Sequence, residues 1–217
     1  MTNTGGSLAI RILRRAELPA DTISLARFLI GKVVVRELAS GRIAGRIVET
    51  EAYPRRDPAA HHFRGPTPRN RSMYLLRGHA YVYFSYGNHF MLNVSAEAAG
   101  VGGGVLIRAL EPLEGIELMQ RNRGTMGVID LARGPGRLAA ALKIDRRLDG
   151  VDLTARGALW LGALGKVKAR DANQNSAQRV VIVARSRRIG ITRAAHRLLR
   201  FYERRNPYVS GSARLRA

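Results

Sequence analysis

Two glutamates, Glu49 and Glu51, stand two residues apart in the apolar run IVETEAY of residues 47–53. Residues at i and i+2 of a β-strand share one face, so the two carboxylates would lie about 6.5–7 Å apart. Carboxyl groups at roughly this separation act as acid and base in inverting glycoside hydrolysis, and the like charge of one raises the pKa of the other. The same spacing fits two solvated glutamates on an edge strand, which is the commoner arrangement. The pair alone leaves both interpretations open.

Aromatic residues follow this pair along the chain. Tyr81 and Tyr83 share one face of a predicted strand over residues 80–86, and Tyr86 stands before a Gly-Asn turn at residues 87–88. A tyrosine in a core needs a partner for its hydroxyl group, whereas beside a basic surface its ring can stack on bases. An aromatic side chain at a hairpin tip can also wedge into a duplex. The tyrosines fit either core packing or nucleic-acid binding.

The charge of the chain favours nucleic-acid binding over core packing as the role of the tyrosines. Its 217 residues include 37 Lys and Arg against 16 Asp and Glu, a formal net charge of +21. Such an imbalance exceeds what solubility requires and favours nucleic acid as the partner. Cysteine is absent, which excludes disulfides and cysteine-based zinc sites. Since the spacings of the histidines match no zinc signature, we expect neither a metal nor another cofactor.

Length and hydropathy favour one domain that has no contact with a membrane. A chain of this size with 46% hydrophobic residues can bury a sizeable core, so residues 1–217 are expected to form a single domain, with residues 1–6 flexible. The N-terminus lacks an apolar signal segment, and no apolar run approaches the length of a membrane span. We therefore expect a cytoplasmic protein, and we expect a monomer because no large amphipathic stripe demands a partner.

Local patterns predict helices and strands without regular alternation. Asp21 is expected to cap a helix that ends at Ile30. Further helices are expected at about residues 112–123, with Pro112 at the start, after the Gly-Pro-Gly turn at residues 134–136, and in part of the basic tail at residues 193–205. Strands are expected at residues 32–38 and 42–51 as one hairpin, 80–86 and 89–96 as another, and 105–110, 157–164 and 179–184. The proline-rich residues 53–70 read as a long functional loop. This mixture predicts an α+β fold: a mixed, mostly antiparallel sheet with surrounding helices and a protruding β-hairpin.

Short segments spread over nearly the whole chain resemble one known family. They are RIVETEAY (46–53), DPAAH (57–61), RG (64–65), TPRN (67–70), GHAYVY (78–83), YG (86–87), LN (92–93), VLIRALEPLEG (105–115), GPG (134–136), RIGI (188–191), RFY (200–202) and NPYVS (206–210). Together they are similar to the alkyladenine (3-methyladenine) DNA glycosylases, the monofunctional, purine-excising type.

This resemblance implies a base-excision repair enzyme for double-stranded DNA that contains damaged purines. Such an enzyme flips an alkylated or deaminated purine, of the 3-methyladenine, 7-methylguanine, hypoxanthine or ethenoadenine type, out of the duplex and hydrolyses its N-glycosidic bond. It leaves an abasic site without cutting the strand. None of the four lysines lies in residues 46–93, so this stretch offers no amine for the Schiff base that strand-cleaving glycosylases form.

The resemblance also implies roles for single residues. Glu51 would be the general base that activates water, Arg108 would hold this carboxylate or the water, and Glu49 would be a structural partner. The base pocket would consist of Tyr53, His61, Tyr83 and Asn93. Among these, Asn93 would reject guanine by crowding its exocyclic amino group, and outside the pocket Tyr86 would fill the gap left in the duplex. The choice of His61 over His62 follows from the position of DPAAH.

Two other classes of protein explain only part of the pattern. A non-catalytic, basic nucleic-acid-binding protein accounts for the charge and the tyrosines, but not for the set of Glu51, Arg108 and Asn93. A carbohydrate hydrolase accounts for the paired carboxylates, but not for a net charge of +21.

Overall fold

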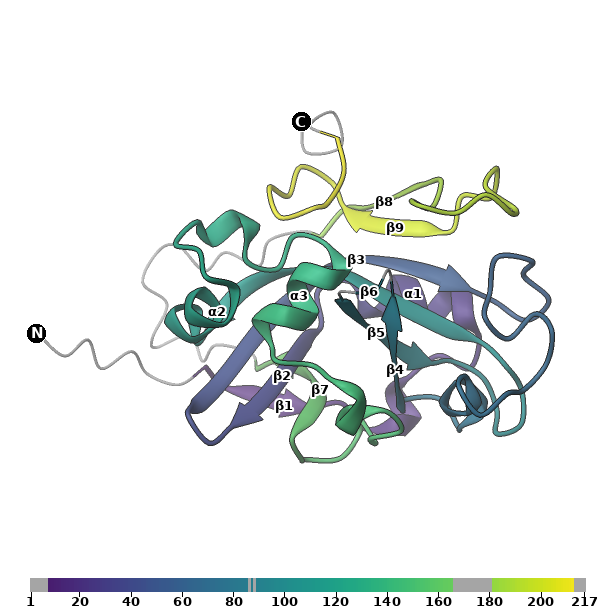
Figure 1. Ribbon diagram of the computed structural model, residues 1–217, viewed down its shortest axis with the longest axis horizontal. Coiled ribbons are helices and arrows are strands. Elements are labelled where there is room, and N and C mark those ends of the chain that lie inside the picture. Colours follow the sequence, from purple (N-terminus) through teal and green to yellow (C-terminus); the bar gives the residue numbers. More distant parts are fainter. Residues whose placement is uncertain (1–7, 86, 88, 166–180, 213–217) are drawn as a thin grey trace, which may run out of the picture.

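The computed structural model describes residues 8–85, 87, 89–165 and 181–212, and over these ranges the chain forms a single α+β domain (Figure 1). Its centre is one sheet of nine strands. The predicted fold class is confirmed, although each strand pairing within the described ranges is antiparallel, so the sheet is not mixed. The prediction for residues 1–6 falls outside the described residues. None of the helices in the described ranges is long and apolar enough to cross a bilayer.

The strands and helices have the following bounds. The strands are β1 (Ile10–Ile12), β2 (Val33–Leu38), β3 (Gly41–Tyr53), β4 (Ala80–Ser85), β5 (His89–Ser95), β6 (Gly104–Glu114), β7 (Leu159–Leu164), β8 (Val183–Ser186) and β9 (Arg200–Glu203). The helices are α1 (Thr22–Leu29), α2 (Ile116–Arg123) and α3 (Pro135–Ala141).

The long strand β3 organises the sheet. The order is β1-β7-β2-β3-β6-β5-β4, and β9 also pairs with β3. On one edge of β3, residues 41–46 pair with β2 and residues 49–51 pair with β9, while β6 runs along the other edge. The second half of β3 therefore lies between β6 and a strand from the far end of the sequence. This half carries Glu49 and Glu51.

Helices cover the sheet and complete the core. α1 packs on β3 and β6, and α3 packs on β5 and β6. As predicted, Asp21 caps α1: its side chain accepts hydrogen bonds from the backbone amides of Ile23 and Ser24 at 3.1 and 2.9 Å. The helix stops before Gly31, whose φ of 84° suits a glycine. The main apolar cluster joins residues from α1, α3 and the central strands.

Both predicted hairpins are present. β2 pairs with β3 through a tight turn, and β4 pairs with β5 from Ala80 opposite Val94 to Ser85 opposite His89. The strand predicted at 105–110 extends further, from Gly104 to Glu114. The strand predicted at 157–164 begins at Leu159. For the strand predicted at 179–184, residues 179 and 180 lie outside the described residues, and β8 begins at Val183.

Two of the helix predictions are wrong: the helix predicted at residues 112–123 begins later, and the tail at residues 193–205 is not helical. Pro112 does not start a helix but lies within β6, opposite Gly45 at a register shift, and β5 pairs only with residues 104–106 of β6. A proline can occupy such a position because its missing N–H leaves no central ladder bond unmade. The helix α2 begins at Ile116, after Gly115 with a φ of 71°.

The tail at residues 193–205 contains turns and the strand β9 in place of a helix. All four residues of β9 are buried, and Phe201 belongs to the main apolar cluster. Arg200 and Glu203 pair with charged residues of β3, so their side chains do not require the solvated helix that their charge suggests. Neither β9 nor the short β1 was predicted from the sequence.

Replacing Gly162 with alanine is expected to destabilise the fold by about 1–3 kcal/mol, because the site is already filled. A Cβ atom on Gly162, in β7, would clash with the side chain of Ile10 and lie 2.9 Å from the ring of Trp160. The measurement is urea unfolding followed by circular dichroism. Gly157→Ala is the matched control, since a Cβ atom there meets nothing within 4 Å. Equal unfolding free energies for the two variants would contradict this packing argument.

Candidate active site

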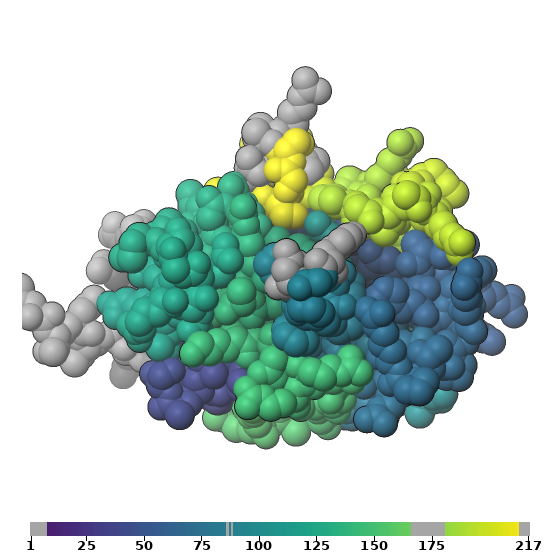
Figure 2. Space-filling view, viewed as in Figure 1, coloured from purple at the N-terminus to yellow at the C-terminus, as the bar shows by residue number. Residues whose placement is uncertain are grey.

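A cavity of about 390 Å³ lies where segments distant in sequence meet. In Figure 2 the hairpin β4–β5, the segment around α3, the loop after β3 and residues 181–199 come together on one face of the molecule. The volume falls in the range typical of pockets for small organic groups. The cavity is lined by Tyr53, Ala59, His61, Met73, Tyr81, Tyr83, Ser85, Met91, Asn93, Leu106, Arg108, Pro135, Ile189, Gly190 and Ile191.

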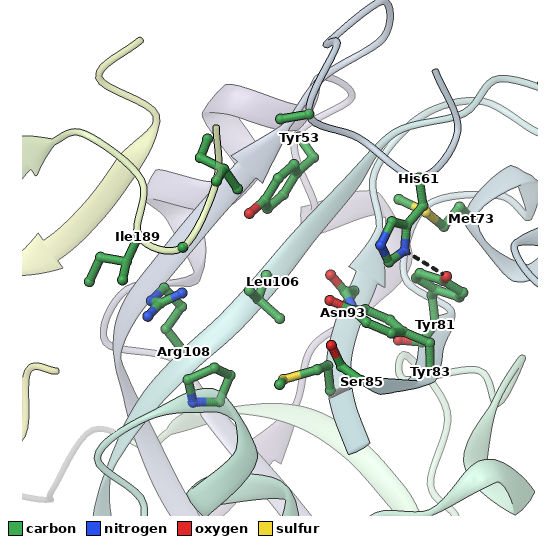
Figure 3. A pocket seen from close by; sticks show the side chains of 15 residues that line it. Tyr53, His61, Met73, Tyr81, Tyr83, Ser85, Asn93, Leu106, Arg108 and Ile189 are labelled. Atoms are coloured by element: carbon green, nitrogen blue, oxygen red, sulfur yellow. Dashed lines mark hydrogen bonds between the residues drawn. The ribbon is translucent and has the colours of Figure 1, made fainter. Parts of the chain in front are cut away.

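Aromatic rings form one wall of this cavity. The rings of Tyr81 and Tyr83 stack with centroids 5.3 Å apart, and the ring of His61 meets Tyr83 edge-on at 4.5 Å. His61 Nδ1 lies 3.0 Å from the hydroxyl oxygen of Tyr81, which fixes the orientation of the imidazole. Figure 3 shows these three rings on one side of the cavity, with Arg108 and Ile189 on the other.

His61 is held in its neutral form. Burial lowers the pKa of its imidazole below the ordinary value of 6.5, and the nearby charge of Arg69 lowers it further. The ring therefore presents an uncharged polar edge to the cavity at neutral pH. His62 does not line this cavity: its Nε2 lies 3.1 Å from the carbonyl oxygen of Pro54, and the residue faces a separate cavity of about 320 Å³.

Asn93 lies at the base of the aromatic wall. It belongs to β5, between Tyr81 of β4 and Leu106 of β6, and only 4% of its surface is exposed. Its side-chain amide donates to the backbone carbonyl of Tyr81 at 3.2 Å. The hydrogen bond fixes the direction of this side chain, so Asn93 limits the shape of any group that enters the cavity.

Glu51 is fully buried, and the three residues that contact its carboxylate, Tyr53, Arg108 and Ile189, line the cavity. One oxygen accepts a hydrogen bond from the Tyr53 hydroxyl at 2.9 Å and lies 3.3 Å from Nη1 of Arg108. The other oxygen accepts from the backbone amide of Ile189 at 2.8 Å. Burial and the charge of Glu51 raise the pKa of Tyr53, so the phenol keeps its proton and donates it. The carboxylate is thus held by donors from three separate segments.

Glu49 has a different environment from Glu51. It accepts hydrogen bonds from Nε of Arg108 at 2.9 Å and Nε of Arg200 at 2.6 Å. The backbone amide and hydroxyl group of Ser210 donate to it at 2.7 and 2.9 Å. Burial acts to raise its pKa, but Arg108 and Arg200 outweigh burial, so the pKa lies below the ordinary value. A carboxylate so enclosed has no proton to give, which removes the acid of the two-carboxylate scheme.

The structure brings most of the predicted site residues together. Tyr53, His61, Tyr83, Asn93 and Arg108 line the cavity, and Glu51 lies directly behind Tyr53, Arg108 and Ile189. The position of Tyr86 lies outside the described residues. In the described ranges no group of three or more histidine, aspartate or glutamate side chains could hold a metal ion.

Sequence reasoning did not assign several residues of this site. Tyr81 lines the cavity beside Tyr83, as their shared strand face could have indicated. Met73 and Met91 carry no signal of their own. Residues 188–191 are the exception, because the resemblance of RIGI implied that a backbone carbonyl of this segment assists Glu51; the structure shows the amide of Ile189 donating to Glu51 and residues 189–191 lining the cavity.

Comparison with known proteins gives one consistent result. The family description methylpurine-DNA glycosylase matches residues 16–207. A protein of Mesorhizobium japonicum is 61% identical over 92% of this chain and 90% of its own length. Relatives from Paraburkholderia phytofirmans and Methanoculleus marisnigri are 47% and 46% identical, over 96% and 88% of this chain and 92% and 94% of their own lengths. All three carry the name "Putative 3-methyladenine DNA glycosylase".

The family match covers nearly the whole chain, and it includes every segment that forms the cavity. The relative from Mesorhizobium japonicum likewise covers 92% of the chain. The chain belongs to the methylpurine-DNA glycosylase family, whose members are DNA repair hydrolases that act on N-glycosyl bonds.

Proposed function

We propose that this protein flips alkylated or deaminated purines out of duplex DNA and releases them with a water molecule activated by Glu51, acting as a monomer. The observation that carries the proposal is the placement of Glu51. A fully buried carboxylate, oriented by Tyr53, Ile189 and Arg108, stands directly behind an aromatic cavity of about 390 Å³. A base in the cavity would present its glycosidic bond toward this carboxylate.

The cavity suits a purine that carries a positive charge. Methylation leaves many purines cationic, and a cation over an aromatic ring gains about 0.5–2 kcal/mol. The rings of Tyr53 and Tyr83 line the cavity, and the neutral imidazole of His61 adds a polar partner without repelling the cation. Because a cationic purine leaves as a neutral base, the reaction needs no strong acid. This agrees with the ionised, enclosed state of Glu49.

The protein must also take the base out of its stack, since the glycosidic bond is inaccessible within a duplex. By family resemblance Tyr86 occupies the gap that the flipped base leaves. Tyr86 itself lies outside the described residues, but the hairpin β4–β5 that carries it also carries Tyr83 and Asn93 of the cavity. One hairpin would thus serve both the gap and the pocket.

The experiment that tests this function uses duplexes with a single hypoxanthine, 1,N6-ethenoadenine or 7-methylguanine. We expect free base together with abasic sites that break in alkali and stay intact without it. Breakage without alkali would contradict the monofunctional mechanism. Binding of the duplexes without base release would favour the non-catalytic nucleic-acid-binding protein.

Replacing Asn93 with alanine is expected to raise the release of normal guanine by about 10-fold or more, because a pocket discriminates by about 1–3 kcal/mol through one group. The hydrogen bond to Tyr81 fixes the Asn93 amide in the cavity wall, and in our proposal this amide crowds the exocyclic amino group of guanine. The assay measures guanine release from undamaged duplexes. Ser95→Ala is the control, because Ser95 is a buried residue of β5 that does not line the cavity. Unchanged guanine release in Asn93→Ala would remove this role.

A further inference from the structure

Asp57 is a fully buried carboxylate outside the cavity lining, in the loop that follows β3. Its oxygens lie 2.7 Å from Nη1 and 3.0 Å from Nη2 of Arg188, so a guanidinium fork meets a carboxylate. Asp57 also accepts a hydrogen bond from the backbone amide of Ala59 at 3.0 Å. Such charge-assisted, two-point pairs fix geometry as well as adding energy.

Arg188 connects this carboxylate to the strand that carries the proposed general base. Its Nη1 donates to the backbone carbonyl of Ala52 at 3.0 Å, the residue between Glu51 and Tyr53. The carbon centre of its guanidinium lies 4.6 Å from the ring centroid of Tyr53. Arg188 therefore contacts β3 next to Glu51 and covers the ring whose hydroxyl group holds Glu51.

The residue after Arg188 completes the contact with Glu51. The backbone amide of Ile189 donates to Glu51 at 2.8 Å, and residues 189–191 line the cavity. Residues 187–199 form neither helix nor strand. A ladder of the sheet therefore does not set the position of this amide, and another fixed contact must do so.

We propose that the Asp57–Arg188 ion pair positions residues 188–191, and through them Glu51 and Tyr53, for base release. Asp57 and Arg188 are positioning residues, because neither lines the cavity. The inference rests on the proposed function of Glu51. Arginine is required at this place because its planar fork can hold the carboxylate and the Ala52 carbonyl together, whereas the single ammonium group of lysine cannot.

The test compares the same substitution at two arginines that meet the same carboxylate. Arg188→Lys is expected to lower the single-turnover rate of base release by about 10²-fold, the loss that follows from a misplacement of about 1 Å, with Kd for lesion duplex within about threefold of the parent. Arg197 reaches Asp57 at 3.3 Å with 35% of its side chain exposed. Arg197→Lys is expected to stay within about twofold in both quantities.

A second measurement reports directly on how firmly residues 189–191 are held. Hydrogen exchange of the amides of residues 189–191 is expected to accelerate at least about 10-fold in Arg188→Lys, and to stay unchanged in Arg197→Lys. Asp57→Asn removes the charge and keeps the shape of the side chain. Its rate of base release and its hydrogen exchange are measured in the same way, and it replaces Arg188→Lys if that variant unfolds.

Parent rates and parent exchange in Asp57→Asn and Arg188→Lys would overturn the inference. An equal loss in Arg197→Lys would also overturn it, because the effect would then belong to general destabilisation. A parent protein that releases no base would instead refute the proposed function, while the exchange measurement would still report on the ion pair.

Discussion

Replacing Glu51 with glutamine is expected to lower base release by about 10²–10⁴-fold, the usual contribution of a general base, while binding of lesion DNA is retained. Glutamine has nearly the same shape, but its single amide oxygen can accept from the Tyr53 hydroxyl or from the Ile189 amide and not from both, and it cannot take a proton from water. Its amide nitrogen would face Nη1 of Arg108 or the amide of Ile189, both of which are donors. The measurement is the single-turnover rate of base release, together with the Kd for the same duplex.

A matched control for Glu51→Gln is Glu117→Gln, at an exposed position in the first turn of α2. This variant loses the same charge from the same molecule and is expected to keep the parent rate. Parent-like release by Glu51→Gln would remove Glu51 from the mechanism. Loss of binding together with release would show that the substitution acts on the pocket as a whole.

The elements predicted correctly from the sequence are those that depend on contacts between residues close together in the chain. Asp21 caps α1 because a carboxylate can reach two free amides one turn ahead, and that pattern is visible in the sequence. The hairpin β4–β5 follows from alternation around a Gly-Asn turn, and this pattern is sufficient to place Tyr83 and Asn93 on paired strands. The predicted loop at residues 53–70 starts one residue later, because Tyr53 is the last residue of β3; residues 54–70 contain neither helix nor strand, and they supply His61 to the cavity.

The elements that depend on contacts between distant segments of the chain were not predicted from the sequence. β9 forms because β2 begins at Val33, opposite residue 46 of β3, which leaves the same edge open for residues 49–51. The sequence of β9, with charges at both ends, shows nothing of this open edge. The proline in β6 was misread for the same reason, since its tolerance depends on where β5 stops pairing.

Net charge was informative about the partner class and misleading about single arginines. Arg46, Arg108, Arg188 and Arg200 are buried and paired with carboxylates of the interior. They do not face solvent, so their charge serves the site and the fold. The pairing of Glu49 with Arg108 leaves Nη1 of that arginine directed at Glu51. Arg108 therefore bridges the carboxylates of Glu49 and Glu51, an arrangement that spacing along the strand could not reveal.

Replacing Glu49 with alanine is expected to lower the free energy of unfolding by about 3–5 kcal/mol, because it leaves Arg200 as a buried charge without its carboxylate partner and Arg108 paired with Glu51 alone. It also removes the acceptor for both Ser210 donors, which hold the C-terminal segment against β3. Urea unfolding at pH 7 measures the change. Glu114→Ala is the control: Glu114 pairs with Arg42 near the surface, and such pairs contribute about 0–1 kcal/mol.

The pH dependence separates an ion-pair effect from a cavity effect at Glu49. The pKa of Glu49 in the fold lies below its ordinary value of 4.5, so the folded state binds the proton less readily than the unfolded state. Its contribution to stability is then fully present above about pH 4.5 and is lost as the pH falls through the folded pKa. We expect the difference in unfolding free energy between the parent and Glu49→Gln to be constant near neutral pH and to shrink below this value. A difference that stays constant down to about pH 3 would assign the stabilisation to packing and not to the charge of Glu49.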